Sequence, residues 1–245
     1  MELDAKTYYS LPEVVDEYAR ATNGIGLWRS EEKVFTRLFK PDEVLLEVGC
    51  GAGRIVFGLW ELGYHRLLGV DIARAMIEEA RRINTVLEYG VSFRSADVAR
   101  LPFGDGEFDG AIFGFNGLMT IPHREKRREA LREIRRVVRP GAWFAFTTHD
   151  RAREKYRDYW ADQEKLWAGG PPSPGLVELG DRWVILPHGN QFIHVPTRDE
   201  VREDLAATGW RLEVDADRAL LALEDEHVTA FSDECVFWIA QKPAT

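Results

Sequence analysis

The stretch VLLEVGCGAGR, residues 44–54, decides the fold of this chain. It overlaps a largely apolar run, 43–48, which is typical of a strand buried on both faces of a parallel sheet. Gly49, Gly51 and Gly53 follow at alternate positions, where glycine allows a sharp turn and a close approach of the backbone to a ligand. A helix is predicted directly after this loop, and the first N–H groups of a helix have no partner within it.

Two well-known nucleotide-binding loops do not match this stretch. The dinucleotide fingerprint G-x-G-x-x-G would place its third glycine at Arg54, which is too large to pack between helix and strand. The phosphate-binding P-loop requires Gly-Lys-Ser/Thr, which this loop lacks. Glu47 beside the loop suits a ligand with a cationic or neutral head better than a pyrophosphate. A glycine-rich turn without any ligand stays open as the alternative.

Outward from this loop, apolar runs alternate with amphipathic segments as far as residue 150. The apolar runs predict strands, and the amphipathic segments between them predict helices. This rhythm predicts an open α/β sheet with helices on both faces, in which ligands bind at the carboxyl ends of the strands. The strands are expected at 43–48, 66–70, 91–94, 108–113 and 142–148, and the helices at 54–62, 73–83 and 123–138, with Pro140-Gly141 as the stop of the last helix.

The rhythm changes after residue 150. A charged helix over 151–168, a Gly/Pro-rich loop and a β-hairpin formed by RWVIL and QFIHV are expected, followed by a helix that Thr197 caps and Gly209 ends, and by strands at 210–214 and 234–241. The hairpin region is too short to form a core of its own. We therefore expect one domain, made of an N-terminal helical lid (1–40), a cofactor-binding core (41–150), an insertion over the sheet edge (151–196) and a C-terminal helix with strands (197–245).

Three carboxylates stand at the ends of successive predicted strands. Glu47 ends the first, Asp71 ends the second, and Asp97 follows the third. Asp71 could accept both hydroxyls of a ribose, or it could cap the helix that follows. Asp97 could accept the exocyclic amine of adenine while the Val98 N–H binds a ring nitrogen, or it could be an ordinary turn residue. Together the three carboxylates favour a nucleoside ligand more strongly than any one of them alone.

Four segments, EVGCGAG, GVDIARAMIEEA, ADVARLPFGDGEFDGAI and ALREIRRVVRPGAWF, resemble the successive motifs of the class I S-adenosylmethionine-dependent methyltransferases, and best their small-molecule "methyltransferase domain" branch. The resemblance covers roughly 40–150 closely. It implies a Rossmann-like, seven-stranded, mainly parallel sheet whose last strand is antiparallel. It also implies S-adenosylmethionine as the cofactor and S-adenosylhomocysteine as the product.

The resemblance also implies which residues contact the cofactor. The glycine loop would contact its methionine part, with Glu47 near the ammonium, and Asp71 would hold the ribose. Ile72 would lie against the adenine, Asp97 and Val98 would bind its edge, and Phe113 and Asn116 would line the methionine side. The expected cofactor-binding residues are Glu47, Gly49, Cys50, Gly51, Gly53, Asp71, Ile72, Asp97, Val98, Phe113 and Asn116.

Far fewer residues of the sequence indicate where the methyl acceptor binds. In-line transfer to an oxygen or nitrogen needs the acceptor atom held behind the methyl group, and a base only where the acceptor loses a proton. The segment Phe115-Asn116-Gly117-Leu118 lacks the [D/N]-P-P-[Y/F/W] tetrad of enzymes that methylate planar amines. His149 and His123 are the candidate bases, with a loop or surface histidine as the alternative. The candidate acceptor or lid residues, for which ordinary packing is the alternative, are Tyr9, Tyr18, Trp28 and His194.

Composition limits the partners. The chain has 245 residues, 45% of them hydrophobic, and a formal net charge of −9. This hydrophobic fraction excludes a disordered chain, and the acidity argues against nucleic-acid binding and a polybasic membrane anchor. The basic segment at 124–136 contains interleaved glutamates, which favours a solvated helix face over an RNA patch. Two cysteines without a metal-binding pattern, no signal-peptide core and no long apolar stretch predict a cytoplasmic protein without metal.

We therefore predict a cytoplasmic methyltransferase of a small molecule, acting as a monomer or homodimer, with no nucleic-acid or membrane partner. Two alternatives stay open at this point. One is a methyltransferase of RNA or protein, although the chain shows neither a basic face nor an added recognition domain. The other is a non-catalytic S-adenosylmethionine-binding sensor or partner subunit, which the glycine loop and the carboxylates do not exclude.

Overall fold

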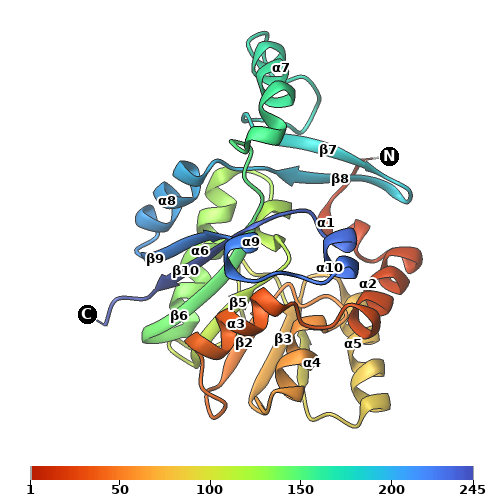
Figure 1. Cartoon of the computed structure of the whole chain (residues 1–245), viewed down its shortest axis with the longest axis vertical. Coiled ribbons are helices and arrows are strands. Elements are labelled where there is room, and N and C mark those ends of the chain that lie inside the picture. The colour runs from red at the N-terminus through yellow and green to blue at the C-terminus, as the bar shows by residue number, and fades with distance from the viewer. Residues whose placement is uncertain (1, 245) are drawn as a thin grey trace.

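The computed structural model describes residues 2–244 and is built around a seven-stranded sheet. The strand order is β4-β3-β2-β5-β6-β10-β9, and β10 alone runs antiparallel to its two neighbours (Figure 1). This architecture confirms the predicted mainly parallel sheet whose last strand is antiparallel. The strands are β2 (Leu45–Val48), β3 (Leu67–Asp71), β4 (Ser92–Ser95), β5 (Phe108–Phe113), β6 (Val138–Thr148), β9 (Arg211–Asp217) and β10 (Val236–Gln241).

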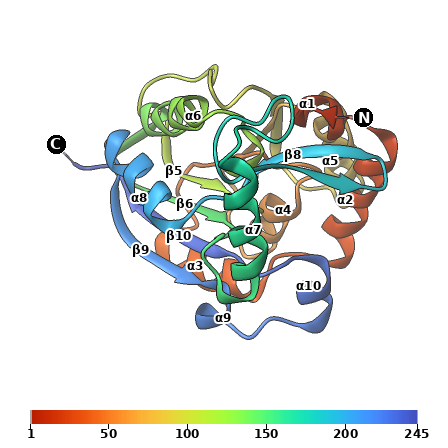
Figure 2. The ribbon, with the colours of Figure 1, turned by 90° about the horizontal axis from the view of Figure 1, so that it is seen from above.

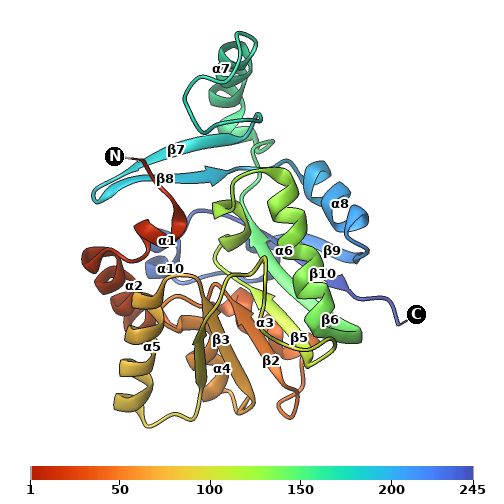
Figure 3. The same ribbon diagram turned by 180° about the vertical axis from the view of Figure 1, so that it is seen from behind.

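Helices cover both faces of this sheet. Successive strand residues point to opposite faces, so Leu45 packs in one hydrophobic cluster with α2 to α5, and Leu46 packs in a second with α6 and α8. Figure 3 shows α6 and α8 together along the second face. The helices are α1 (Ala5–Tyr8), α2 (Pro12–Gly24), α3 (Arg29–Leu38), α4 (Arg54–Glu61), α5 (Arg74–Leu87), α6 (Arg124–Val137), α7 (Arg157–Trp167), α8 (Arg198–Ala207), α9 (Arg218–Leu221) and α10 (Glu226–Phe231), with 3-10 turns η1 (Gly117–Thr120) and η2 (Glu154–Tyr156).

One predicted boundary is wrong. The sequence predicted that Pro140-Gly141 would separate a helix from a strand over 142–148, but α6 ends at Val137 and β6 begins with the next residue. Pairing between β5 and β6 skips from Phe108↔Val138 to Gly110↔Trp143. This irregularity accommodates Pro140, which cannot donate a hydrogen bond to a regular ladder.

A smaller sheet lies over the carboxyl ends of the parallel strands. The predicted hairpin is present as β7 (Asp181–Leu186) and β8 (Gly189–His194), and α7 projects beyond it (Figures 1 and 2). An additional strand, β1 (Glu2–Leu3), was not predicted from the sequence; it pairs in parallel with β8 and so connects the N-terminal segment to the hairpin. A two-residue strand is too short to show a periodic pattern. Within 2–244, no helix is long and apolar enough to cross a membrane.

A buried polar cluster fastens the hairpin to α8. His194, at the end of β8, is 2% exposed, and its Nδ1 lies 2.8 Å from a carboxylate oxygen of Asp181. Its Nε2 lies 3.7 Å from Glu200 of α8, which also accepts a hydrogen bond from Arg151 at 2.6 Å. Glu178, Asp181 and His194 are close enough to share a metal ion, but Glu178 already pairs with the guanidinium of Arg127 at 2.6 Å. The cluster is therefore explained as a set of ion pairs.

This cluster is expected to make the fold sensitive to acid. Burial opposes ionisation of Asp181 and Glu200, but His194 beside both and Arg151 beside Glu200 outweigh it and hold both pKa values below the ordinary 3.8 and 4.5. The unfolded chain therefore binds protons more readily, and the stabilisation present above pH 4.5 is lost as the pH falls further. Asp181→Asn should lower the unfolding temperature at neutral pH and flatten its drop toward about pH 3.5.

The matched control is Asp199→Asn, because the Asp199 side chain is 82% exposed and forms only an i,i+3 pair with Arg202. Thermal unfolding at several pH values measures both variants. An acid-induced drop that is the same in Asp181→Asn as in the unmodified chain would contradict this role of the cluster.

Candidate functional site

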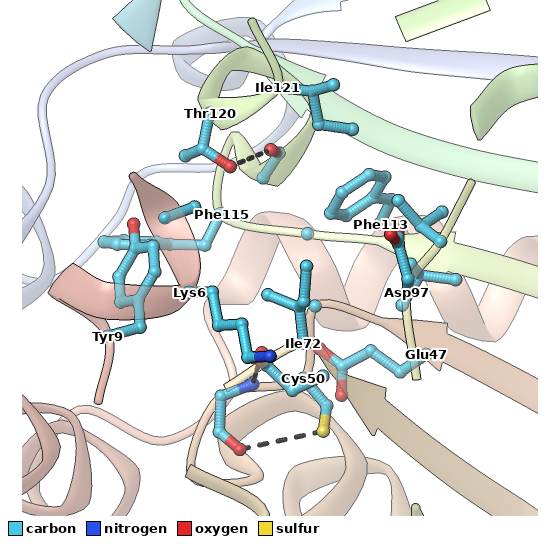
Figure 4. A pocket seen from close by; sticks show the side chains of 18 of the residues that line it. Lys6, Tyr9, Glu47, Cys50, Ile72, Asp97, Phe113, Phe115, Thr120 and Ile121 are labelled. Carbon is cyan, nitrogen blue, oxygen red and sulfur yellow. Dashed lines mark hydrogen bonds between the residues drawn. The ribbon is translucent and has the colours of Figure 1, made fainter. Parts of the chain in front are cut away.

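The strand ends surround one cavity of about 690 Å³, a size within the usual range for small-ligand sites (Figure 4). Most of the predicted site residues line it, although they come from distant parts of the chain. The predicted residues that line the cavity are Glu47, Gly49, Cys50, Gly51, Asp71, Ile72, Asp97, Val98 and Phe113, together with Tyr9, Tyr18 and His123. Gly53, Asn116, Trp28, His149 and His194 lie outside its lining.

The three glycines of the loop have different structural roles. All three have positive φ, between +52° and +98°, which L-residues rarely adopt. A Cβ on Gly49 would lie 2.8 Å from the Phe113 ring, and one on Gly53 would lie 2.6 Å from the Phe57 ring. Gly51 lines the cavity and has more room, since its Cβ would lie 3.5 Å from the Tyr18 ring. Gly49 and Gly53 are thus needed for packing, and Gly51 keeps the cavity floor open.

Asp71 joins two backbone segments beside the cavity and remains available for a ligand, but it does not cap α5, whose N-cap is Ala73. Its Oδ1 accepts the N–H of Ala73 at 2.8 Å, and its Oδ2 accepts the N–H of Gly51 at 2.9 Å. The carboxylate therefore joins the glycine loop to the start of α5. Burial raises its pKa despite these two hydrogen bonds. Each oxygen still has a free lone pair, so Asp71 can accept further hydrogen bonds from a ligand in the cavity.

A buried ion pair supports the floor of the cavity. Arg54, the residue that breaks the dinucleotide fingerprint, donates to both carboxylate oxygens of Glu31 at 2.6 Å. Glu47, 4% exposed, accepts the N–H of Val56 at 3.2 Å, and burial raises its pKa although the nearby Arg54 opposes that shift. Glu31 and Arg54 are 23 residues apart, and no local pattern in the sequence predicts their pairing.

Trp28 belongs to the packing around this ion pair. The sequence placed it among possible lid residues, but it is 1% exposed and contacts two guanidinium groups. Its ring centroid is 4.7 Å from Cζ of Arg54 and 5.0 Å from Cζ of Arg218. Such cation–π contacts stabilise a buried indole and hold both cations in place. The packing alternative is the one that the structure supports for Trp28.

Two tyrosines form a wall of the cavity, and Gln191 supports one of them from behind the lining. The hydroxyl of Tyr9 accepts a hydrogen bond from Gln191 of the hairpin at 2.6 Å, and the rings of Tyr9 and Tyr18 meet edge to face at 5.5 Å. Burial raises the pKa of both phenols. Both therefore stay protonated near neutral pH and can donate hydrogen bonds, but they cannot act as bases there.

The two candidate base histidines lie in different surroundings. Nδ1 of His149 is 3.0 Å from the Glu234 carbonyl oxygen, so it must carry the proton, and the acceptor Nε2 lies 3.4 Å from the amide nitrogen of Asn116. Burial lowers the pKa of His149, which keeps the ring neutral. His149 thus orients Asn116 outside the cavity lining. His123 is exposed and does line the cavity.

Backbone strain is concentrated beside the cavity. Four residues other than glycine have positive φ between 2 and 244, and three of them, Phe115, Asn116 and His123, follow β5. Such conformations are costly and cluster where function requires a fixed geometry. The Oδ1 of Asn116 is also buried without a hydrogen-bond partner. The turn after β5 is therefore the strained part of the site.

Several residues that line the cavity were not predicted from the sequence. Lys6 on α1 points toward Cys50 and the glycine loop (Figure 4), and it forms no salt bridge among residues 2–244. Neither Lys6 nor the lining residues from the C-terminal half belong to a recognisable motif. They reach the ends of the sheet only through the β1–β8 pairing and the final strands, which the local sequence does not reveal. The other missed residues include Arg54, Phe115, Thr120, Ile121, Phe192 and Phe231.

Comparisons with known proteins identify the family of this chain. Residues 45–141 match the methyltransferase domain family. The O-methyltransferase resE of Aspergillus sclerotiorum is 34% identical over 133 residues, which are 53% of this chain and 49% of that protein. The demethylmenaquinone methyltransferase of Desulfitobacterium hafniense is 32% identical over 197 residues, or 74% of this chain and 71% of that protein. The chain spans about half the length of the first O-methyltransferases that it matches.

A solved structure shows the same fold. A SAM-dependent methyltransferase from Methanosarcina mazei superimposes with a TM-score of 0.69 at 21% identity, covering 86% of this chain and 98% of that one. The motif order, the strand-end geometry and the extent of the match to the demethylmenaquinone enzyme agree. This chain belongs to the class I S-adenosylmethionine-dependent methyltransferase family.

Proposed function

We propose that this chain binds S-adenosylmethionine in the 690 Å³ cavity and transfers its methyl group to an oxygen or nitrogen atom of a small molecule. One observation carries the proposal. The glycine loop and the carboxylates of Glu47, Asp71 and Asp97 line the same cavity, which continues past them under the hairpin. Two relatives named as O-methyltransferases are consistent with it.

The residues present suit this cofactor. Glu47 lies where it can receive a cationic ammonium group, and Gly51 leaves space for the backbone approach. Asp71 would hold the ribose hydroxyls, Ile72 would contact the adenine face, and Asp97 with Val98 would bind the adenine edge. The sulfonium group supplies an electrophilic methyl when the cofactor is bound.

This chain's own contribution to transfer is to position the acceptor and exclude water. Tyr9 and Tyr18 on the N-terminal segment would close over the reacting atoms and donate hydrogen bonds. His123 is the histidine that could accept a proton from the acceptor at the cavity, since His149 lies outside the lining and is engaged with Asn116.

Lys6 is expected to bind the carboxylate of the cofactor's methionine part, because it points toward the glycine loop (Figure 4). Lys6→Met should weaken the binding of S-adenosylhomocysteine about tenfold, as loss of one charge-assisted hydrogen bond does. It should leave the binding of 5′-methylthioadenosine, which has no carboxylate, unchanged. Titration calorimetry measures both ligands, and Lys6→Arg is the control that keeps the charge. Equal weakening of both ligands would contradict this role.

The proposed activity is tested by turnover of cofactor labelled in its methyl group, offered in parallel to a metabolite extract, to RNA and to protein. Label in a small molecule is the expected result. Label only in RNA or in protein would overturn the small-molecule acceptor. Binding of S-adenosylhomocysteine without transfer to any of the three would favour a sensor or partner subunit instead.

A further inference from the structure

A second part of the cavity is lined by aromatic rings. We call it the aromatic end and define it by Tyr9, Phe115, Trp183, Phe192 and Phe231. Tyr9 follows α1, Phe115 follows β5, Trp183 and Phe192 pair across the hairpin, and Phe231 ends α10. In Figure 4, Thr120 and Ile121 lie above the cavity, on the side away from Glu47 and Cys50.

The rings of the aromatic end support one another in fixed pairs. Phe115 stacks on Phe231 with centroids 5.2 Å apart and an interplanar angle of 24°. Trp183 meets Phe192 edge to face at 5.9 Å and 79°. Phe192 is 4% exposed, and its place opposite Trp183 is fixed by the strand register. These walls therefore present preformed ring surfaces, which favour offset or edge-on contact with another ring.

The polar atoms of the aromatic end are already bonded within the protein. The Tyr9 hydroxyl accepts from Gln191 at 2.6 Å, and the indole N–H of Trp183 donates to the Pro174 carbonyl oxygen at 3.3 Å. Thr120, nearby, donates to the carbonyl oxygen of Gly117 at 2.8 Å. The O–H of Tyr9 is the donor that stays available here, and one hydrogen bond does not replace the water that a charged ligand group would lose.

Other ionisable residues of the cavity lie at its mouth or at the glycine loop. His123, Lys126 and Glu129 line it from the first turns of α6, and all three are exposed, which places them at its mouth. Lys6 points toward Cys50 at the glycine loop. Arg54 lies beside the aromatic end, with its Cζ 5.8 Å from the Phe115 ring centroid, but its guanidinium is paired with Glu31. The aromatic end therefore offers a ligand mainly ring surfaces.

We propose that the aromatic end holds the methyl acceptor and that this acceptor carries an uncharged, planar ring system. This inference rests on the proposed function, since it assigns the other end of the same cavity to the cofactor. A planar ring makes the largest contact with the walls for the volume it fills, and an uncharged one leaves no desolvated charge against them.

The test measures ligand binding to the chain saturated with S-adenosylhomocysteine. The probes are 2-naphthol, the saturated alcohol decahydro-2-naphthol and the charged 6-hydroxy-2-naphthoate, which differ in planarity or charge on one skeleton. We expect 2-naphthol to bind at least tenfold more tightly than either of the others. Equal or tighter binding of the saturated or the charged probe, or no binding of 2-naphthol, would overturn the proposal.

Two substitutions on the hairpin locate the binding. Trp183→Leu should weaken 2-naphthol about tenfold and change decahydro-2-naphthol little, whereas Trp183→Phe should retain most of the affinity for 2-naphthol. Ile185→Ala is the matched control, because Ile185 lies two residues along the same strand and is 84% exposed. If Trp183→Leu leaves 2-naphthol binding unchanged, the assignment of the aromatic end fails. If the chain does not bind S-adenosylhomocysteine at all, the proposed function fails first.

Discussion

Replacing Arg54 with methionine is expected to lower the free energy of unfolding by about 3–5 kcal/mol, the usual result when one partner of a buried ion pair is removed. Glu31 is 1% exposed and receives two hydrogen bonds from this guanidinium. Without Arg54, the Glu31 carboxylate would stay buried with only the backbone N–H of Trp28 as a donor. Glu47 nearby would lose the cation that opposes the rise of its pKa.

Equilibrium unfolding in denaturant measures this loss. The matched control is Arg74→Met, because Arg74 also pairs with a glutamate, but its side chain is 83% exposed, and such pairs contribute about 1 kcal/mol or less. The double variant Glu31→Gln/Arg54→Met should recover part of the lost stability, since it removes the buried charge as well. A loss in Arg54→Met no larger than that in Arg74→Met would contradict the role of the ion pair.

The part of the site that the sequence could predict is the part that follows directly from strand ends. Glu47, Asp71 and Asp97 stand next to apolar runs, and parallel strands bring their carboxyl ends to one edge. The glycine loop could be predicted equally well, because the positive φ at Gly49 and Gly53 favours glycine, and glycines at these positions are visible in the sequence. The α/β sheet could be predicted from local patterns too, namely the alternation of apolar runs with amphipathic segments.

The rest depends on contacts between distant segments. Lys6 and Trp183 reach the cavity through the pairing of β1 with β8, and Phe231 reaches it from a six-residue helix near the C-terminus. The sequence did not distinguish Trp28 as a packing residue from Tyr9 as a cavity residue, because both precede the core in an aromatic-rich segment. Only the positions of Arg54 and Arg218 around Trp28 separate the two.

Asp71→Ala is expected to weaken the binding of S-adenosylhomocysteine roughly 100-fold, since two hydrogen bonds to a charged group contribute about 3 kcal/mol or more together. The variant also frees the N–H groups of Gly51 and Ala73, which Asp71 now binds. It should therefore also lower the unfolding temperature. A fall in affinity alone could reflect this loss of loop structure, and the ribose assignment needs a measurement that separates the two effects.

A comparison of two ligands makes that separation. The 2′,3′-dideoxy form of S-adenosylhomocysteine lacks the hydroxyls that Asp71 would hold, so it should bind the unmodified chain far more weakly. Asp71→Ala should weaken that ligand only by the part due to loop structure, and the two ligands should bind the variant with similar affinity. Titration calorimetry with both ligands and both proteins gives the four affinities from which the coupling between Asp71 and the hydroxyls is calculated. If removing the hydroxyls weakens binding to Asp71→Ala as much as binding to the unmodified chain, Asp71 holds the glycine loop and does not bind the ribose.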